Sequence, residues 1–226
     1  MSIKMLTLGR RRAGDAVALS ERDRRLVWRL AALLLDYPGA ETLAMADQLT
    51  TAAKELPEAV GAPLIAVMGD FCDGDPLELA ARYVETFDMR RRASLHLTYY
   101  AYGDTRKRGM ALLRFKHAYR HAGMALGDRE LPDYLPLVLE FAATIDQLQG
   151  ERLLVEHVPV LELLRLSLLD SDSIYANVVA AVLTTLPSIS TADRRRIAEL
   201  AAQGPPEEDV GLEPFAVDPL MAEGRR

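Results

Sequence analysis

The apolar residues of this chain recur with the 3.6-residue period of an α-helix along nearly its whole length. No segment shows the sustained period-two alternation of Val, Ile and Thr that is typical of a half-buried strand. Leu26, Leu30 and Leu34 lie on one such helical stripe, and Ser20 with Asp23 forms the pattern of a capping box before it. The pattern therefore predicts an all-α fold.

Caps, prolines and glycines divide this pattern into separate helices. The expected helices span residues 20–35, 39–55, 63–71, 75–87, 94–102, 105–122, 132–149, 151–169, 173–186 and 191–202. We expect Gly150 to end a helix and Pro159 to kink the one after it. The prediction is one domain of nine or ten helices over residues 20–202, with a flexible N-terminus (1–19) and a disordered acidic tail (203–226).

Composition excludes several classes of protein. The chain has 226 residues, a formal net charge of -6 and one cysteine. This charge argues against an extended nucleic-acid surface, and the apolar runs are too short to span a membrane. Arg10 to Arg12 are followed by charged residues and not by the apolar stretch of an export signal. We expect a cytoplasmic protein with no nucleic-acid partner and no membrane insertion.

Candidate catalytic groups are sparse. His117 and His121 stand one helical turn apart, but a third metal ligand is missing. Cys72 is the only thiol, and its apolar surroundings favour a small buried side chain over a nucleophile. No glycine-rich phosphate loop is present. The sequence predicts no catalytic site, no metal and no cofactor.

The stretch from Tyr83 to Gly123 is dense in tyrosine, arginine and glycine. Such residues suit a surface that contacts another protein, because they combine large contact area with polar or adaptable groups. A solvated basic turn between two helices explains the same composition. The residues alone leave both interpretations open.

Three segments carry a family resemblance. Residues 83–110 read YVETFDMRRRASLHLTYYAYGDTRKRGM, residues 130–141 read ELPDYLPLVLEF, and the helix over 26–38 ends in LLDYP. They closely resemble the nitrate reductase delta subunit family of molybdenum cofactor assembly chaperones, the NarJ-like members of the TorD-like superfamily. One residue departs from that pattern, since the second segment usually carries histidine where this chain has Tyr134.

The resemblance implies a TorD-like helical fold and a chaperone without turnover or a cofactor of its own. Its client is the N-terminal segment of the respiratory nitrate reductase alpha subunit, which it holds in the cytoplasm while the molybdenum cofactor is inserted. It would also bind the immature alpha-beta complex and be absent from the mature enzyme. In physical terms this is an amphipathic segment laid into a groove between helices.

The resemblance and the chemistry of the residues together suggest a client-binding site. The apolar and aromatic members would form a groove or its supporting wall: Tyr83, Phe87, Tyr99, Tyr100, Met110, Leu135 and Leu139. Acids would line its rim: Asp88, Asp104, Glu130 and Asp133. Arginines would pair with those acids or with client carboxylates: Arg90, Arg91, Arg106 and Arg108.

Three alternatives remain at this stage. The chain could serve another molybdoenzyme, could be a permanent subunit of the finished complex, or could be a helical nucleotide-dependent enzyme. The missing phosphate loop and catalytic cluster count against the enzyme.

Overall fold

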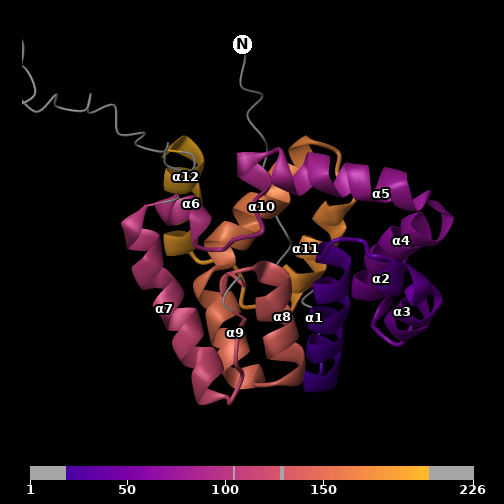
Figure 1. Cartoon of the computed structure of the whole chain (residues 1–226), viewed down its shortest axis with the longest axis horizontal. Coiled ribbons are helices and arrows are strands. Elements are labelled where there is room, and N and C mark those ends of the chain that lie inside the picture. The colour runs from indigo at the N-terminus through magenta and orange to yellow at the C-terminus, as the bar shows by residue number, and fades with distance from the viewer. Residues whose placement is uncertain (1–18, 104, 128–129, 204–226) are drawn as a thin grey trace, which may run out of the picture.

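Helices make up the regular structure of the chain in the computed structural model, which describes residues 19–103, 105–127 and 130–203 (Figure 1). The α-helices of these residues are α1 (Glu21–Leu35), α2 (Ala40–Ala44), α3 (Ala46–Ala53), α4 (Glu58–Asp73), α5 (Pro76–Tyr83), α6 (Tyr99–Tyr102), α7 (Arg106–His121), α8 (Leu135–Thr144), α9 (Gln147–Glu156), α10 (Val158–Asp170), α11 (Tyr175–Thr184) and α12 (Thr191–Gln203). A π-helix (Val84–Asp88) continues α5, and a 3-10 turn (Arg91–Ala93) follows it. The predicted all-α class is confirmed. Of the residues expected to be flexible or disordered, 1–19 and 203–226, all but Leu19 and Gln203 lie outside the described part, and Gln203 is the last residue of α12.

Helix α1 lies at the centre of the packing. Its capping box forms as expected, with the Asp23 amide donating to Ser20 Oγ and the Ser20 amide donating to the Asp23 carboxylate. The apolar stripe of α1 then packs along α8 and α11. Trp28 is fully buried in this contact, and its indole N–H donates to Thr185 Oγ1 at 2.7 Å. Satisfying this donor lets a large aromatic side chain fill the interior without an unpaired polar atom.

The remaining helices surround this centre on two sides. Helices α2 to α5 lie to one side of α1 in Figure 1, where α4 packs on α3 and α11. Helices α6, α7 and α12 lie on the other side, and α12 packs on α10. The longest segment of the family resemblance, residues 83–110, therefore connects the two sides of the molecule, since it runs from the end of α5 into α7.

The described residues contain twelve α-helices and not nine or ten, because two expected helices are each divided. The segment 39–55 breaks at Met45, whose backbone leaves the helical region between α2 and α3. The segment 151–169 breaks at His157, between α9 and α10. The segment 132–149 begins only at Leu135 and ends at Thr144, so that α9 begins at Gln147.

Neither Gly150 nor Pro159 has its predicted role. Gly150 lies inside α9, where α9 crosses α8 so closely that a Cβ would overlap Ala142. Pro159 does not kink a helix but lies in the first turn of α10, where its missing N–H has no intrahelical acceptor to satisfy. His157, whose backbone is not helical, separates α9 from α10.

The close crossing of α8 and α9 predicts that a larger residue at position 150 destabilises the protein. Gly150→Ala should lower the free energy of unfolding by about 1–3 kcal/mol, the usual cost of overpacking a close contact. Gly109→Ala is the matched control, because Gly109 is an exposed glycine inside α7 with no neighbouring atom within 4 Å of its Cβ position. That variant should gain about 0.5–1 kcal/mol from the higher helix propensity of alanine. Urea denaturation followed by circular dichroism measures both, and equal stability of the two variants would contradict the close crossing.

Candidate functional site

The three segments of the family resemblance meet in space through two tyrosine hydroxyls. The Tyr134 hydroxyl donates to Asp36 Oδ1 at 3.0 Å and lies 3.0 Å from the Tyr83 hydroxyl. The Tyr83 hydroxyl reaches the Leu35 carbonyl at 3.1 Å. Each residue belongs to a different segment, so the end of α1, the end of α5 and the start of α8 are joined at one point.

Burial raises the pKa of both phenols, with the neighbouring Asp36 carboxylate adding to the effect. They therefore remain protonated at neutral pH and act as hydrogen-bond donors. The Tyr134 hydroxyl thus joins Asp36 to Tyr83 without a group that titrates near pH 7.

Aromatic rings extend this junction into the core. The Tyr83 and Phe87 ring centroids are 4.9 Å apart, and Phe87 lies at the same distance from Tyr175 on α11. Tyr37 stacks edge-on against Tyr83 at 5.5 Å and is half exposed. Phe87 sits in the π-helix, an uncommon geometry that is frequent at functional sites. Tyr83 and Phe87 are thus buried, and Tyr37 is the exposed ring at the edge of this aromatic cluster.

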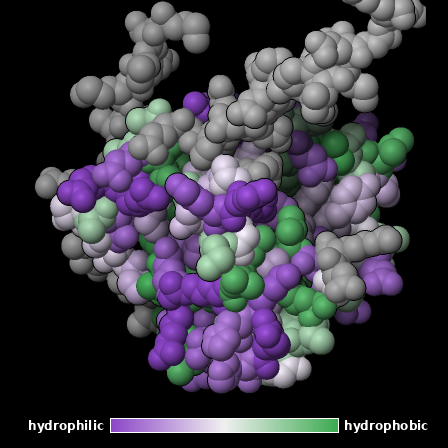
Figure 2. All heavy atoms as spheres, turned by 60° about the vertical axis from the view of Figure 1, so that its left-hand side comes forward, coloured by the Kyte–Doolittle hydropathy of each residue, from purple (hydrophilic) through white to green (hydrophobic). Residues whose placement is uncertain are grey.

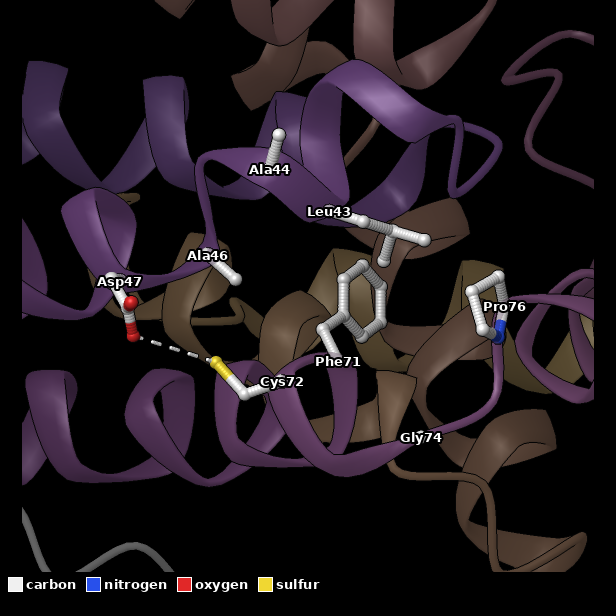
Figure 3. Close-up of a pocket in the computed structure, with 8 residues that line it drawn as sticks. All are labelled: Leu43, Ala44, Ala46, Asp47, Phe71, Cys72, Gly74 and Pro76. Atoms are coloured by element: carbon white, nitrogen blue, oxygen red, sulfur yellow. Dashed lines mark hydrogen bonds between the residues drawn. The ribbon is translucent and has the colours of Figure 1, made fainter.

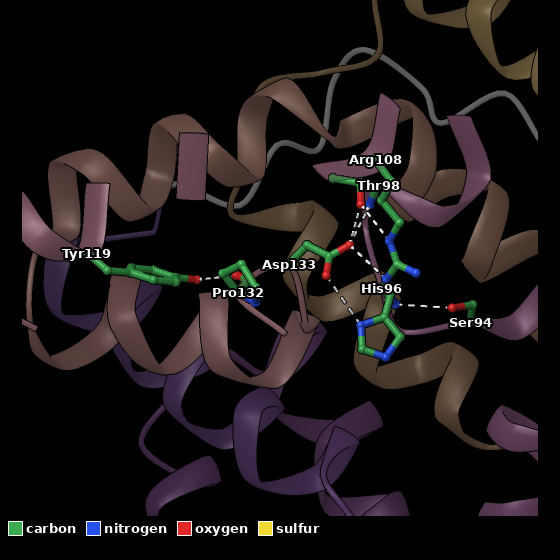
Figure 4. A network of polar contacts seen from close by, with 7 residues as sticks. All are labelled: Ser94, His96, Thr98, Arg108, Tyr119, Pro132 and Asp133. Atoms are coloured by element: carbon green, nitrogen blue, oxygen red, sulfur yellow. Dashed lines mark hydrogen bonds and ion pairs between the residues drawn. The ribbon is translucent and has the colours of Figure 1, made fainter. Parts of the chain in front are cut away.

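A second junction is a polar network around the buried carboxylate of Asp133 (Figure 4). Oδ2 accepts from the Thr98 amide at 3.0 Å and from the Thr98 hydroxyl at 2.5 Å. Arg108 Nη2 lies 3.5 Å from the same oxygen, while its Nε donates to Thr98 Oγ1 at 3.2 Å. His96 Nδ1 lies 3.4 Å from Oδ1. One carboxylate therefore joins the loop before α6, the first turn of α7 and the segment before α8.

Backbone hydrogen bonds clamp the same two segments together. The Leu97 amide donates to the Asp133 carbonyl at 3.0 Å, and the Leu135 amide donates to the Leu95 carbonyl at 2.8 Å. This pairing is an isolated antiparallel bridge between His96 and Tyr134. Figure 4 also shows the Tyr119 hydroxyl, which donates to the Pro132 carbonyl at 2.7 Å.

The network holds Asp133 in its charged form. Burial alone raises the pKa of this carboxyl, but the nearby His96 and the two hydrogen bonds from Thr98 outweigh it and lower the pKa to about 2. An ionised carboxylate at the centre of the network strengthens its hydrogen bonds. Asp133 is therefore a buried positioning group, which corrects the expectation that it lies at the rim of a groove.

The other predicted site residues divide by burial. Those in the interior are Tyr83, Phe87, Tyr100, Arg108, Leu135 and Leu139. Leu135 and Leu139 are fully buried core residues of α8, so they line no surface groove. Those on the surface are Asp88, Arg90, Arg91, Arg106, Met110 and Glu130, while Tyr99 is half-buried. Asp104 lies outside the described residues.

The predicted pairing of arginines with rim acids holds for one pair of described residues, Arg108 with Asp133, and that pair is internal. Arg90 instead pairs with Glu85 at 3.3 Å, and Glu130 accepts from the Gly127 amide at 3.1 Å. Both contacts lie at the surface, where such pairs stabilise by about 1 kcal/mol at most.

A small pocket of about 140 Å³ opens beside the Asp133 network. Thr98 belongs to both, because its hydroxyl joins the network and its side chain lines the pocket. The lining residues come from the loop before α6 and α6 itself, from the α9–α10 junction and from α12: Leu97, Thr98, Ala101, Tyr102, Glu156, His157, Pro159, Val160, Arg196 and Leu200. Figure 2 shows the side of the molecule that lies to the left in Figure 1, where hydrophobic side chains appear as separate patches among hydrophilic ones.

Sequence reasoning missed the part of this pocket formed by α9, α10 and α12. Glu156, His157, Arg196 and Leu200 come from segments with no motif, and only the fold brings them to α6. His157 donates from Nδ1 to the Leu153 carbonyl at 2.7 Å if that nitrogen carries the proton. Burial lowers its pKa, so a neutral imidazole faces the pocket at neutral pH. Asp36 and Tyr37 were also absent from the expected site, although they belong to the LLDYP segment.

A second pocket, of about 280 Å³, lies between the α2–α3 turn and the end of α4 (Figure 3). Cys72 lines it and is exposed, which corrects the expected burial of this thiol. Its neighbour Phe71 takes the buried position at the end of α4. Desolvation and the nearby carboxylates of Asp47 and Asp73 raise the pKa of Cys72. The thiol form therefore dominates at neutral pH, which does not suit a nucleophile.

Among the described residues, no group of three or more His, Cys, Asp or Glu side chains is arranged to hold a metal ion. His117 and His121 lie side by side on α7, with ring centroids 4.8 Å apart. Within the same described ranges, no helix has the length and apolar character needed to cross a bilayer.

The Asp133 network makes a prediction about acid stability. Because the pKa of Asp133 is about 2 in the folded state and about 3.9 in an unfolded chain, its contribution is present above pH 4 and is lost as the pH falls through 2. The shift corresponds to about 2–3 kcal/mol at neutral pH. Asp133→Asn should remove this stability and flatten the slope of stability against pH between about 4 and 2 relative to the wild-type chain. Urea unfolding at several pH values measures both chains, with the exposed Asp88→Asn as control. Parallel pH profiles for wild type and Asp133→Asn would show that the carboxylate is not held in this way.

The chain is similar to known proteins of one family. The pattern that defines the nitrate reductase delta subunit family matches residues 44–180. A probable nitrate reductase molybdenum cofactor assembly chaperone, NarJ of Bacillus subtilis, is 30% identical over 172 residues, which cover 76% of this chain and 94% of that protein. NarJ of Escherichia coli K12, also named as such a chaperone, is 36% identical over 63% of this chain and 62% of its own length.

One longer protein and one solved structure are also similar to this chain. The nitrate reductase-like protein NarX of Mycobacterium tuberculosis is 42% identical over 71% of this chain, but the match spans only 24% of that longer protein. A crystal structure of a putative redox enzyme maturation protein from Archaeoglobus fulgidus superposes with a TM-score of 0.53, over 75% of this chain and 96% of the other, at 19% identity. That likeness shows the fold alone. The family match and the Bacillus relative together establish that this chain belongs to the nitrate reductase delta subunit family.

Proposed function

We propose that this protein is a cytoplasmic chaperone that binds the N-terminal segment of the respiratory nitrate reductase alpha subunit. It keeps that subunit competent for molybdenum cofactor insertion and for assembly, binds the immature alpha-beta complex, and leaves before the enzyme is mature. The names of its Bacillus and Escherichia relatives support this role, because both are called assembly chaperones and neither is named as a catalyst. The protein acts by binding and needs no cofactor of its own.

The observation that carries the proposal is the position of the pocket beside α6. It lies where the longest segment of the family resemblance reaches the surface, and the Asp133 network fixes its wall through Thr98. Tyr102 lines the pocket and is partly exposed, and Met110 and Leu113 are exposed apolar residues on the neighbouring α7. An amphipathic segment binds by setting apolar anchors into such places.

Charged groups border these apolar residues. Arg106 and Met110 are one turn apart on the exposed face of α7, and Glu156 and Arg196 line the pocket. Charges at the rim of an interface set the register and the rate of association more than its total affinity. The exposed residues of the expected site, Asp88, Arg90, Arg91, Arg106, Met110 and Glu130, are accordingly proposed as client contacts. Buried members such as Tyr100 and Leu139 support the wall behind them.

The match to part of NarX supports the association with nitrate reductase in particular. A related segment there belongs to a longer protein that is itself named nitrate reductase-like. We therefore favour the nitrate reductase alpha subunit as client over the catalytic subunit of another molybdoenzyme.

Calorimetric titration with a peptide of the first ~15–20 residues of the alpha subunit tests this function. We expect one-to-one binding with a Kd of about 1 µM or lower. Met110→Ala should weaken binding by about tenfold, as expected for a buried anchor in the complex. Leu148→Ala is the matched control, because Leu148 is an exposed apolar residue of α9 outside the expected site. Arg106→Ala should mainly slow association at low salt.

The outcome that would reject the function is an absence of binding by the wild-type chain to both the peptide and the immature alpha-beta complex. Equal losses in Met110→Ala and Leu148→Ala would keep the function but reject this surface. If the protein preferentially captured the catalytic subunit of a different molybdoenzyme, that subunit would be its client instead.

A further inference from the structure

We propose that α12 is a displaceable occupant of the client groove, and that the surface beneath it docks an amphipathic, arginine-bearing helix. This inference rests on the proposed function, because it identifies the client segment as the helix that replaces α12. It also predicts which kind of helix binds the surface beneath α12, which we call the α12 seat. This prediction can be tested without the client.

Helix α12 is attached to the rest of the described structure by few side chains. Leu200 is its one buried residue among those described, and Ile197, one turn earlier on the same face, is half-buried. Helix α12 packs on α10, and Leu200 also lines the pocket beside α6. Withdrawal of α12 would expose Leu200 and part of Ile197 on the helix itself, together with the apolar side chains of Leu97 and Val160 beside it.

The side-chain polar bonds of α12 in the described residues are internal to the helix and its cap. Ser190 and Asp193 form a reciprocal cap, with the Asp193 amide donating to Ser190 Oγ at 3.1 Å. Glu199 pairs with Arg195 at 3.4 Å and with Arg196 at 3.5 Å. Helix α1 differs, since Arg25 donates to the Ala143 carbonyl of α8 and Trp28 to Thr185. Helix α12 can therefore leave without abandoning a hydrogen bond to its neighbours.

The surface beneath α12 is suited to a helix. Arg196 and Leu200 form one wall of the 140 Å³ pocket, which by itself is too small to admit a client helix. The other walls include Leu97, Ala101 and Val160, which are apolar and come from two different segments. Removing the α12 wall would open the pocket into a trough between α6 and α10. A trough of this kind is the usual receptor for an amphipathic helix.

The sequence of α12 indicates which helix the trough accepts. Three consecutive arginines, 194–196, precede Ile197 and Leu200, which are spaced by three and so share one face. Glu156 lines the pocket together with Arg196 and carries a carboxylate that already pairs with Arg114. An occupant with arginine beside an aliphatic pair of this spacing would meet the same apolar wall and the same acid. The partner is thus a basic amphipathic helix and not an acidic segment.

Occupancy by α12 has a thermodynamic consequence. A client that needs the empty trough binds with an affinity reduced by the fraction of chains in which α12 has left. Covering the trough also keeps an apolar surface away from solvent when no client is present. Weakening the α12 seat must therefore tighten client binding, whereas a merely structural helix would give the opposite result.

The decisive variant is Leu200→Ala in the full chain, with Arg195→Ala as control on the outer face of the same helix, where the Arg195 side chain is 86% exposed. We expect Leu200→Ala to lower the apparent Kd for the alpha-subunit peptide by about threefold to tenfold and Arg195→Ala to leave it unchanged. In the wild-type chain, saturating peptide should increase amide hydrogen exchange across residues 191–203. Unchanged or weaker binding by Leu200→Ala, or retained protection of α12 in the saturated complex, would overturn the proposal.

A synthetic peptide of residues 190–203 separates this inference from the identity of the client. It should bind the Leu200→Ala chain, and a version with Ala at positions 197 and 200 should not. Binding of the α12 peptide with no binding of the alpha-subunit peptide would keep the seat and reject the proposed client. No binding of the α12 peptide would reject the seat, whatever the client does.

Discussion

The buried carboxylate of Asp133 is the interaction on which the rest of the candidate site depends. It holds the loop before α6 through Thr98 and His96, and it holds the first turn of α7 through Arg108. A buried charge is tolerated only when it is paired and hydrogen-bonded, so this carboxylate requires all these partners to keep their positions. The surface near α6 is consequently a rigid wall, even though it is built from loops and short helices.

That rigidity suits the binding surface that we propose. The tyrosine junction at Asp36, Tyr83 and Tyr134 joins one side of the molecule to the other, and the Asp133 network, one residue away, holds the pocket side. The phenols of Tyr83 and Tyr134 and the carboxylate of Asp133 each stay in one charge state at neutral pH. The contrast with α12 is informative, because that helix keeps its polar bonds to itself and is joined to α10 by apolar contact. A fixed wall and a helix held by apolar contact suit the reversible binding that we propose.

Local patterns predicted much of the fold. The capping box at Ser20 and the apolar stripe of α1 occur as expected, because each depends on residues within a few turns of one another. Gly150 and Pro159 were assigned the wrong roles for the opposite reason. Whether a glycine ends a helix or lies at a helix crossing depends on what packs against it, and Ala142 is on another helix. The same applies to Cys72, whose exposure follows from the rotation of α4 about its axis.

The sequence by itself determined the helical class, most helix positions and, through its resemblance, the family. The tertiary structure alone decided which members of the Tyr83–Met110 segment are available for contact. Asp133 and Arg108 look like rim charges in the sequence, yet they pair with each other in the interior because a loop and a helix start meet there. Glu156, His157 and Leu200 gave no sequence signal, since a pocket built from three distant segments exists only once α6, α10 and α12 have packed. Periodicity and caps are encoded locally, whereas burial and pairing are properties of contacts between residues far apart in the chain.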